Sequence, residues 1–352
     1  MNLKDKVNEI NTIKEDIILC YDTIKEKLTN KNVDISDRDK LLDIINKIDD
    51  IKTGVEIEGG SKLPPWYKLE IKIEDTWIKA NVMSLKRKEL TSSSVGNKIY
   101  AIGGYSSDII AKNEYYDINT NTWTDKTALY TKRNTLTSNS IEDKIYVIGG
   151  FNGGPVNKNE LYDTNANTWT SKTVMTTNRY GLTSNIFNDK IYVIGGYKDV
   201  AVNNNEVYDV NSDTWTSKKE MTTKRTRLTS SIISNIIYCT GGYDGNKYLN
   251  IHESYDLDSD TWTTKNKMTT NRNNLASGLV DGRIYCIGGY NGNDTLTNNE
   301  CYDILSDTWS SKKEMTVKRG YLTASTVEEK IYVIGGFNNT DKNLDTNEIY
   351  IP

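Results

Sequence analysis

Charged residues recur in this sequence at a spacing regular enough to raise the question of catalysis. An arginine and a glutamate recur at intervals of 46 to 48 residues, at Arg87, Arg133, Arg179, Arg225, Arg272 and Arg319 and at Glu114, Glu160, Glu206, Glu253, Glu300 and Glu348. A pair of carboxylates hydrolyses glycosides only where the two groups have unlike environments and so take different roles. Six equivalent glutamates lack that asymmetry. The pattern therefore predicts structural Arg–Glu pairs, repeated once per unit.

The two residues that follow each repeated arginine differ from unit to unit. They are Lys88-Glu89, Asn134-Thr135, Tyr180-Gly181, Thr226-Arg227, Asn273-Asn274 and Gly320-Tyr321. Because variable loops on a rigid framework usually hold the binding residues, we predict a ligand- or partner-binding face. Its candidates are Lys88, Glu89, Asn134, Thr135, Tyr180, Thr226, Arg227, Asn273, Asn274 and Tyr321. The alternative is a set of unconstrained surface loops. Tyr180, Arg227 and Tyr321 are the strongest candidates, since Tyr and Arg are favoured anchors.

Histidine and cysteine offer little for metal or nucleophilic chemistry. The chain has one histidine, His252, and four cysteines, Cys20, Cys239, Cys286 and Cys301, without a CxxC spacing. We predict buried free thiols rather than a zinc site or a disulfide framework, and we expect His252 in a surface loop. Residues 290–299, rich in Asn, Asp and Gly, offer oxygen ligands for calcium but lack the spacing of an EF-hand. No metal or cofactor is predicted.

The element that positions these side chains must repeat with the same period. Gly-Gly pairs end at Gly104, Gly150, Gly196, Gly242, Gly289 and Gly336, and tryptophans keep the same spacing at Trp77, Trp123, Trp169, Trp215, Trp262 and Trp309. One unit, residues 136–171, contains four short segments: LTSNSIE, KIYVIGG, NELYDT and NTWTS. The apolar second segment is typical of a strand buried on both faces. Two-residue turns such as Glu142-Asp143, Asn188-Asp189 and Asp281-Gly282 predict tight hairpins. Each unit is thus predicted to be a four-stranded antiparallel meander.

The repeat resembles the kelch repeat, with its Gly-Gly after the second strand, Tyr in the third strand and Trp in the fourth. The resemblance covers about residues 67–352 and implies an all-β, six-bladed β-propeller. A missing Cβ in the Gly pair permits positive φ and close backbone approach where blades converge. The Tyr and Trp side chains are expected to fill the space between adjacent blades.

Counting strands predicts how the ring closes. The first unit opens with only a fourth-strand segment around Trp77, and the last unit stops after its third-strand segment at 346–352. We expect the strand around Trp77 to complete the last blade, because closure removes open sheet edges.

The connections of a meander alternate between two faces. The long, diverse loops after each Gly-Gly pair therefore share a face with the variable pairs, and in the kelch family the corresponding face often binds partners. Two propeller enzyme families fit poorly. Galactose-oxidase-like enzymes need two copper-binding histidines, and the turns before each Trp lack the glycine of sialidase aspartate boxes. We predict a protein without enzymatic activity.

Charge and hydropathy exclude further classes. The formal net charge is -4, with 44 basic and 48 acidic residues, which disfavours binding to nucleic acid. No apolar run approaches the 18 residues of a membrane span, so no membrane insertion is predicted. The first residues, MNLKDKVNEI, show no secretory signal.

Residues 1–52 differ in composition from the repeats. Leu3, Val7, Ile10, Ile17, Ile24 and Leu28 fit a 3-4 heptad spacing, and Ser36 is a plausible N-cap for a second helix over 37–51. We predict a small α-helical segment that forms an oligomerising bundle, with a trimer favoured. A self-contained helical hairpin is the alternative. Residues 53–66 are expected to form a linker.

The stretch from Ile13 to Asp49 also resembles a leader of tail-associated proteins of phages and phage-like particles, although Asn32 stands where that leader usually has Gly before VDIS. The resemblance implies a tail-fibre-like receptor-binding protein of a phage or tailocin particle, made in the bacterial cytoplasm. Residues 1–52 would join other tail or baseplate proteins, and the propeller would bind a glycan or protein of the host cell surface. The alternative function is a cytoplasmic kelch adaptor that binds another protein.

Overall fold

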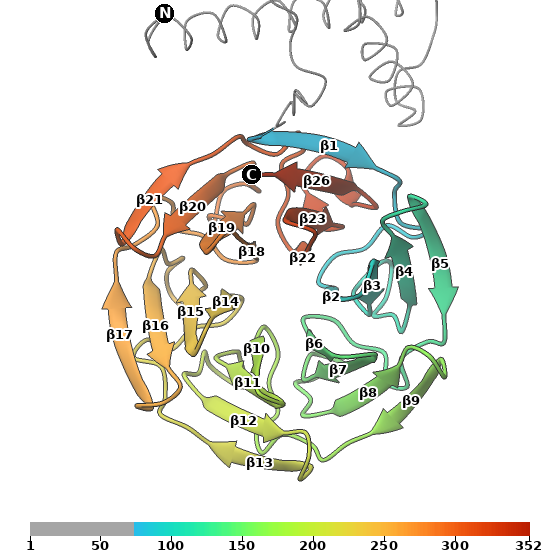
Figure 1. The fold of residues 1–352 in the computed structure, drawn as a ribbon, viewed down its shortest axis with the longest axis horizontal. Coiled ribbons are helices and arrows are strands. Elements are labelled where there is room, and N and C mark those ends of the chain that lie inside the picture. Colours follow the sequence, from blue (N-terminus) through green and yellow to red (C-terminus); the bar gives the residue numbers. More distant parts are fainter. Residues whose placement is uncertain (1–73) are drawn as a thin grey trace, which may run out of the picture. The chain divides into compact units, whose positions relative to one another are not determined.

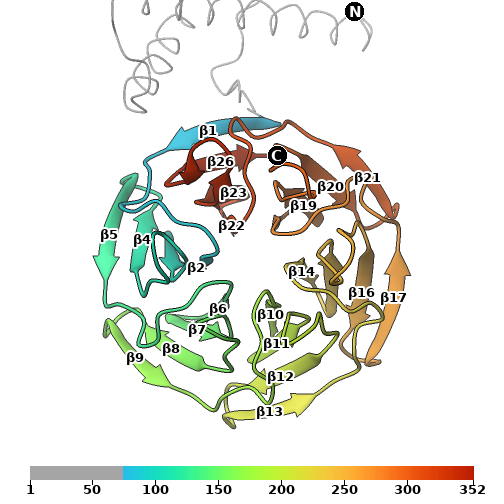
Figure 2. The ribbon, with the colours of Figure 1, turned by 180° about the vertical axis from the view of Figure 1, so that it is seen from behind.

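The computed structural model of the protein describes residues 74–352 and shows six four-stranded antiparallel sheets arranged around a central axis (Figure 1). The predicted six-bladed all-β propeller is confirmed. Figure 2 shows the same closed ring from the opposite side. The predicted helical segment 1–52, the linker 53–66 and the first residues of the predicted propeller lie outside the described residues.

Within each blade we name the strands a to d from the axis outward. Blade 1 consists of β2 (Thr91–Val95), β3 (Lys98–Ile102), β4 (Asn113–Asp117) and β5 (Thr122–Lys126). Blade 2 consists of β6 (Thr137–Ile141), β7 (Lys144–Ile148), β8 (Asn159–Asp163) and β9 (Thr168–Ser171). Blade 3 consists of β10 (Thr183–Phe187), β11 (Lys190–Ile194), β12 (Asn205–Asp209) and β13 (Thr214–Ser217).

The second half of the ring repeats this order. Blade 4 consists of β14 (Thr229–Ile233), β15 (Ile236–Thr240), β16 (His252–Asp256) and β17 (Thr261–Lys265). Blade 5 consists of β18 (Ala276–Val280), β19 (Arg283–Ile287), β20 (Asn299–Asp303) and β21 (Thr308–Ser311). Blade 6 consists of β22 (Thr323–Val327), β23 (Lys330–Ile334), β26 (Asn347–Ile351) and β1 (Thr76–Ala80), and its b–c loop holds the short pair β24 (Phe337–Asn338) and β25 (Lys342–Asn343).

Strand β1 closes the ring as predicted. It pairs with β26, with Trp77 opposite Tyr350, so the two ends of the described chain lie side by side in one blade (Figure 1). Trp77 Nε1 donates to the carbonyl of Lys313 in the preceding blade at 2.8 Å. The other five repeat tryptophans make the same bond, each at 2.8 Å, to the blade before their own. The closing seam therefore repeats the contact that joins every other pair of blades.

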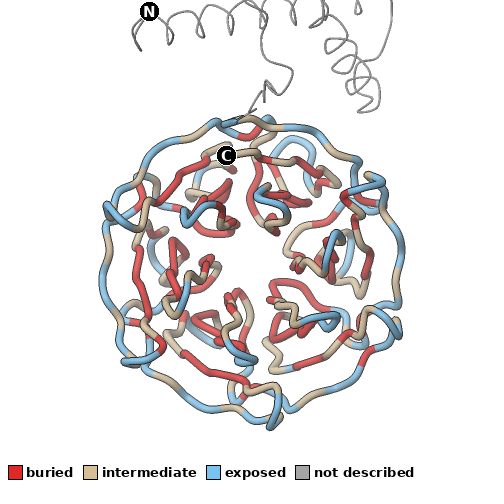
Figure 3. The backbone as a smooth tube through the Cα atoms, viewed as in Figure 1, coloured by how far each residue is buried: buried red, intermediate tan, exposed pale blue. Residues whose placement is uncertain are grey.

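The b strands form the core because both of their faces are buried. In β7, Ile145 and Val147 pack toward blade 1, whereas Tyr146 and Ile148 pack toward blade 3. Figure 3 shows these inner strands as buried and the d strands at the rim as largely exposed. Since apolar burial is the main favourable term in folding, each blade is stabilised chiefly by its two neighbours.

The six Arg–Glu pairs are structural, as predicted. Every pair lies within one blade, fully or almost fully buried, with nitrogen–oxygen distances of 2.6 to 3.1 Å. Arg179 shows the pattern of blades 3 to 6: its Nη2 pairs with Glu206 at 2.6 Å and donates to the carbonyl of Val193, while Nη1 donates to the carbonyl of Gly195. In blades 1 and 2 the arginine Nη1 is buried without a partner. Burial lowers the pKa of Arg87, Arg133 and Arg319 to about 10, which keeps them charged at neutral pH.

The Gly-Gly pairs take the predicted conformation. Gly195 and Gly196 have φ of 65° and 113°. A Cβ on Gly195 would stand 2.7 Å from the carbonyl oxygen of Arg225 in the next blade. Only glycine allows both this approach and this backbone conformation.

The expected surface position of His252 is wrong. His252 is the first residue of β16, has 0% exposure, and its Nδ1 lies 2.8 Å from Thr240 Oγ1. Its ring stacks on Tyr238 and packs edge-on against Tyr302 and Trp309. The other c strands begin with Asn at this position, and their b strands end in Ile where blade 4 has Thr240. The threonine hydroxyl and the aromatic neighbours are what allow an imidazole to be buried here. Burial lowers the pKa of His252 to about 3.

Candidate ligand-binding face

The variable pairs and the b–c loops lie at the same end of the blades. The first residue of each pair forms an antiparallel bridge with the aromatic residue that begins the b–c loop. These bridges are Lys88–Tyr105, Asn134–Phe151, Tyr180–Tyr197, Thr226–Tyr243, Asn273–Tyr290 and Gly320–Phe337. Each blade thus presents a loop junction whose backbone is fixed by two hydrogen bonds while its side chains differ.

The second residues of the pairs form a closed ring of backbone hydrogen bonds around the axis, which we call the axial ring. Its members are Glu89, Thr135, Gly181, Arg227, Asn274 and Tyr321. Each N–H donates to the carbonyl of the member in the preceding blade, at 2.6 to 2.9 Å, and Glu89 closes the circle by donating to Tyr321. All six have positive φ, between 47° and 62°. This conformation costs a non-glycine residue about 1 kcal/mol, so the ring holds five strained positions in place.

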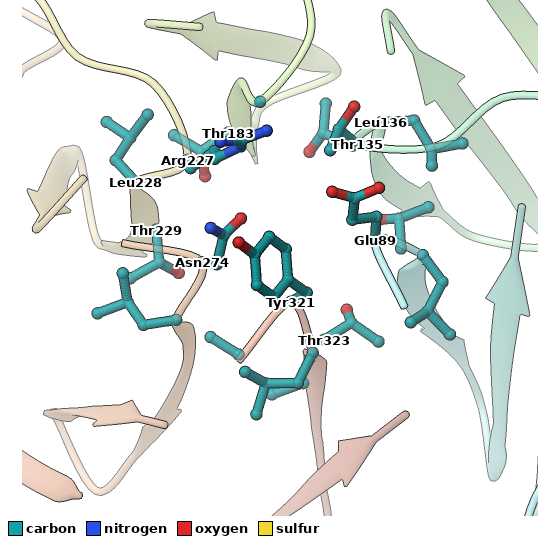
Figure 4. Close-up of a pocket in the computed structure, with 18 of the residues that line it drawn as sticks. Glu89, Thr135, Leu136, Thr183, Arg227, Leu228, Thr229, Asn274, Tyr321 and Thr323 are labelled. Atoms are coloured by element: carbon teal, nitrogen blue, oxygen red, sulfur yellow. The ribbon is translucent and has the colours of Figure 1, made fainter. Parts of the chain in front are cut away.

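The axial ring forms the mouth of a cavity of about 180 Å³, which we call the axial pocket. All six blades contribute to it, so it lies on the propeller axis (Figure 4). Beneath the ring residues the wall is made of the six leucines that follow them, Leu90, Leu136, Leu182, Leu228, Leu275 and Leu322, and then of hydroxyl residues of the a strands.

The hydroxyl residues join neighbouring a strands through side-chain hydrogen bonds. A Thr at the first position of an a strand contacts a Ser at the second position of the next one, as in Thr91–Ser138, Thr137–Ser184, Thr183–Ser230, Thr229–Ser277 and Thr323–Ser92, at 2.6 to 2.9 Å. Between blades 5 and 6 these positions are Ala276 and Ala324. The floor of the axial pocket is therefore polar on five seams and apolar on one.

Two opposite charges face the axial pocket. Glu89 Oε2 accepts a hydrogen bond from Asn134 Nδ2 at 2.7 Å. Burial raises the pKa of Glu89, and the cations of Arg227 and Lys88 oppose that shift. The side chain of Arg227 makes no hydrogen bond or ion pair to the described residues, and its Nε is buried without a partner. The pocket thus holds a carboxylate and a guanidinium that are not paired with each other.

Tyr321 lies between these two charges, and its ring projects over the pocket (Figure 4). Burial raises the pKa of its hydroxyl, while the Arg227 cation works against that shift. Beside it, Lys88 Nζ stands 4.5 Å from the ring centre of Phe337 and 5.5 Å from those of Tyr105 and Tyr321. The three rings hold the Lys88 ammonium at the pocket rim through cation–π attraction.

Aromatic side chains continue around the rim in two groups. In blades 2 and 3, Tyr180 contacts both Phe151 and Tyr197, with ring centres 5.3 Å apart in each pair. Across blades 4 to 6, consecutive ring centres 5.0 to 6.5 Å apart link Tyr243, Tyr248, Tyr290, Tyr321 and Phe337. Such surfaces stack well on flat or partly apolar ligands and also offer phenolic hydrogen bonds.

The structure brings half of the ten predicted site residues into one pocket. Glu89, Thr135, Arg227, Asn274 and Tyr321 line the cavity. Lys88 and Tyr180 lie at its rim. The side chains of Asn134, Thr226 and Asn273 are instead buried behind the axial ring, where they bond to Glu89, Gly181 and Asn274 respectively.

The sequence interpretation missed the rim aromatics and the hydroxyl floor. Tyr105, Phe151, Tyr197, Tyr243, Tyr290 and Phe337 each follow a Gly-Gly pair directly. An aromatic residue at this position in all six units could have indicated the rim. It recurs as regularly as the framework residues do, however, and so does not stand out from them. The floor residues lie in the first segment of each unit, such as LTSNSIE, and nothing in one unit shows that six such strands meet at an axis.

Other chemistry predicted from the sequence can now be placed. Cys239, Cys286 and Cys301 are free and buried. Asp294, in the stretch considered for calcium, bonds to Lys318 and Asn339. Across residues 74–352, no three His, Cys, Asp or Glu side chains are grouped to hold a metal ion. The same residues include no helix with the length and apolar character of a membrane span.

Comparison with known proteins agrees with this architecture. The KLHDC2/KLHL20/DRC7 Kelch-repeats domain model matches residues 88–263 and again 135–336. No curated protein matches the chain. Among solved structures, that described as "Structure of YjhT" superposes with a TM-score of 0.68 at 14% identity, covering 76% of this chain and 95% of that one. At this identity the likeness concerns the fold alone.

Proposed function

The chain belongs to the kelch-repeat family, whose propeller is a binding domain, and we propose that it recognises a host cell-surface ligand through the axial pocket and its aromatic rim. One observation carries this proposal. The backbone of the axial ring is the same in all six blades, whereas its side chains are Glu, Thr, Gly, Arg, Asn and Tyr. A framework that fixes six positions and varies their chemistry suits selective binding.

The setting we propose is the distal tail of a phage or tailocin. Its support is the resemblance of residues 13–49 to a tail-protein leader. In this proposal residues 1–52 trimerise and join other tail or baseplate proteins, while the propeller is the recognition head. Light scattering of the full-length protein tests the assembly, and a monomer would contradict the trimer.

The ligand we favour is a glycan or a protein of the host surface, bound without chemical conversion. Exposed faces of Tyr180 and Tyr321 would stack on sugar rings or on apolar side chains, and Asn274 offers directional hydrogen bonds. Turnover of any member of a glycan panel would contradict the non-enzymatic part of this proposal.

Adsorption to cells is the decisive experiment. We expect purified full-length protein to bind cells of related bacterial strains, and Tyr180→Ala with Tyr321→Ala to reduce that binding at least tenfold. The matched control is Leu305→Ala, a fully exposed residue in a c–d turn at the other end of the blades. Unchanged adsorption of the double variant would remove the face from the proposal. Capture of one intracellular protein, with no adsorption to cells, would favour the adaptor function instead.

A further inference from the structure

Glu89 and Arg227 lie opposite each other across the propeller axis. They occupy equivalent positions in blades 1 and 4 of a six-bladed ring, and the hydrogen bonds of the axial ring fix both backbones. Figure 4 shows the carboxylate and the guanidinium on opposite sides of the cavity. They form no ion pair with each other, so the ring keeps the two charges apart.

Arg227 stands out among the arginines of residues 74–352. The six repeat arginines and Arg283 all form ion pairs, whereas Arg227 forms none. Its side chain lies over Gly181, where an added Cβ would stand 3.1 Å from Arg227 Cγ and would clash with Thr226 Oγ1. The absence of a side chain at position 181 therefore makes room for the guanidinium in the pocket.

Glu89 is also only partly satisfied. Asn134 bonds to Oε2, and Oε1 has no hydrogen bond to the described residues. The nearest cation on the rim, Lys88, is held over three aromatic rings and forms no ion pair with Glu89. One carboxylate oxygen therefore remains available on the side of the pocket opposite Arg227.

We propose that the axial pocket binds a zwitterionic group, with the anionic part of the ligand at Arg227 and its ammonium at Glu89. A ligand with a single charge is attracted by one of these two side chains and repelled by the other, since both charges act across a small, partly desolvated space. A ligand that carries both charges gains from both. The cavity of about 180 Å³ is below the usual range of about 300–1,000 Å³ for drug-sized ligands. It suits a terminal group rather than an extended chain, while Tyr321 covers the segment between the two charges.

This inference rests on the proposed function, because it names the chemistry of a ligand for the same face. The test compares probes that differ only in charge: 4-aminobutyrate against butyrate and n-butylamine, with glycine and 6-aminohexanoate to vary the separation of the charges. Binding to the full-length protein is followed by calorimetry and by tyrosine fluorescence. We expect at least one zwitterion to bind tenfold or more tightly than both single-charge probes. Equal affinity for butyrate, or binding of none of the zwitterions at millimolar concentration, overturns the inference.

Two isosteric variants locate the charges. Arg227→Gln and Glu89→Gln should each reduce zwitterion affinity at least tenfold. Arg227→Gln should improve n-butylamine binding and Glu89→Gln should improve butyrate binding, because each removes a repulsion. Arg283→Gln, which removes an arginine from the other end of blade 5, should change none of these values. If both variants bind the zwitterion as tightly as wild type does, the probe binds outside the axial pocket and the inference is overturned.

Adsorption to cells separates this inference from the proposed function. Suppose that the Glu89→Gln, Arg227→Gln double variant adsorbs to cells as well as wild type does. That result would refute the zwitterion site and leave the proposed cell recognition intact. Wild-type protein that adsorbs to no cell but binds the zwitterion would refute cell recognition and leave the pocket chemistry intact.

Discussion

Arg225 and Arg227 stand two residues apart in blade 4, yet their surroundings are opposite. Arg225 is fully buried, pairs with Glu253 at 2.6 Å and donates to the carbonyls of Gly241, Ile251 and Cys239. Arg227 is half-buried in the axial pocket, and its guanidinium bonds to none of the described residues. The first arginine is repeated in every blade, and the second appears in one.

The difference shows how the propeller separates stability from recognition. The guanidinium of a framework arginine such as Arg225 is held by an ion pair and by backbone carbonyls of its own blade, and a buried charge without such partners is costly. At the axial ring the backbone makes the structural bonds itself. The side chains there make none of the bonds that close the axial ring.

Of the substitutions considered, Arg225→Gln should cause the largest loss of stability. It leaves Glu253 buried without its cation, and burial already raises the pKa of that carboxyl. Removing one partner of a buried pair costs about 3–5 kcal/mol, so the urea midpoint should fall sharply. The double variant Arg225→Gln, Glu253→Gln should recover part of the loss, because no charge is then stranded. Exposed ion pairs contribute less than about 1 kcal/mol to stability. A loss of that size for Arg225→Gln would contradict a framework role for Arg225.

The next largest effect is the pH dependence of stability that blade 4, unlike the other blades, gains from a buried histidine. His252 is neutral when folded, with a pKa of about 3, whereas an unfolded histidine titrates near 6.5. Below about pH 6.5 the unfolded chain binds a proton that the folded chain does not. The free energy of unfolding should therefore drop by about 1.4 kcal/mol per pH unit, until about pH 3.

The matched variant gives blade 4 the residues of its neighbours, His252→Asn with Thr240→Ile. Urea unfolding between pH 7 and pH 4 should show a shallower loss of stability than in wild type. His252 is the only histidine in the chain, so the difference between the two pH profiles reports this group. Parallel profiles would contradict the burial of a neutral imidazole.

A third test asks whether the closing seam is weaker than the others. Trp77 and Trp215 each donate to the preceding blade at 2.8 Å and pack at a tilt against a c-strand tyrosine, with ring centres 4.9 and 5.1 Å apart. Both are half-buried, so we expect Trp77→Ala and Trp215→Ala to cost about 2 kcal/mol each, below the usual range for a fully buried tryptophan. Calorimetric melting of the two variants measures this. A loss for Trp77→Ala that exceeds that of Trp215→Ala by more than 1 kcal/mol would show that closure is the weak point.

The framework was predictable from the sequence because its requirements are local and repeated. A Gly-Gly pair, a buried strand, a Tyr and a Trp report the same neighbours six times, and strand counting identified the role of Trp77. His252 escaped prediction because its burial depends on Thr240 and on aromatic rings of blade 5. A single histidine among five asparagines gives no sign of those partners.

The pocket was predictable only in part. Variation after each repeated arginine identified six junctions that meet around the axial pocket, yet it could not separate Glu89, which faces the cavity, from Asn134, which supports it from behind. That division follows from the positive φ of the second residue in each pair. Asn134 and Asn273 have no such backbone conformation, and a non-glycine residue with positive φ has no reliable signature in the sequence.

The smallest effect on stability should come from Arg227→Gln, the same substitution as the first test, placed two residues further along the chain. Glutamine adopts the same backbone conformation at the same cost, and no ion pair is lost, so we expect a change within about 0.5 kcal/mol of zero. Losing a cation whose Nε is buried without a partner even permits a slight gain, because an unsatisfied buried donor is unfavourable. Urea unfolding measures the difference under the conditions used for Arg225→Gln. A loss above about 1.5 kcal/mol would mean that Arg227 belongs to the framework, and the separation between closure and recognition would then fail at the residue that best represents it.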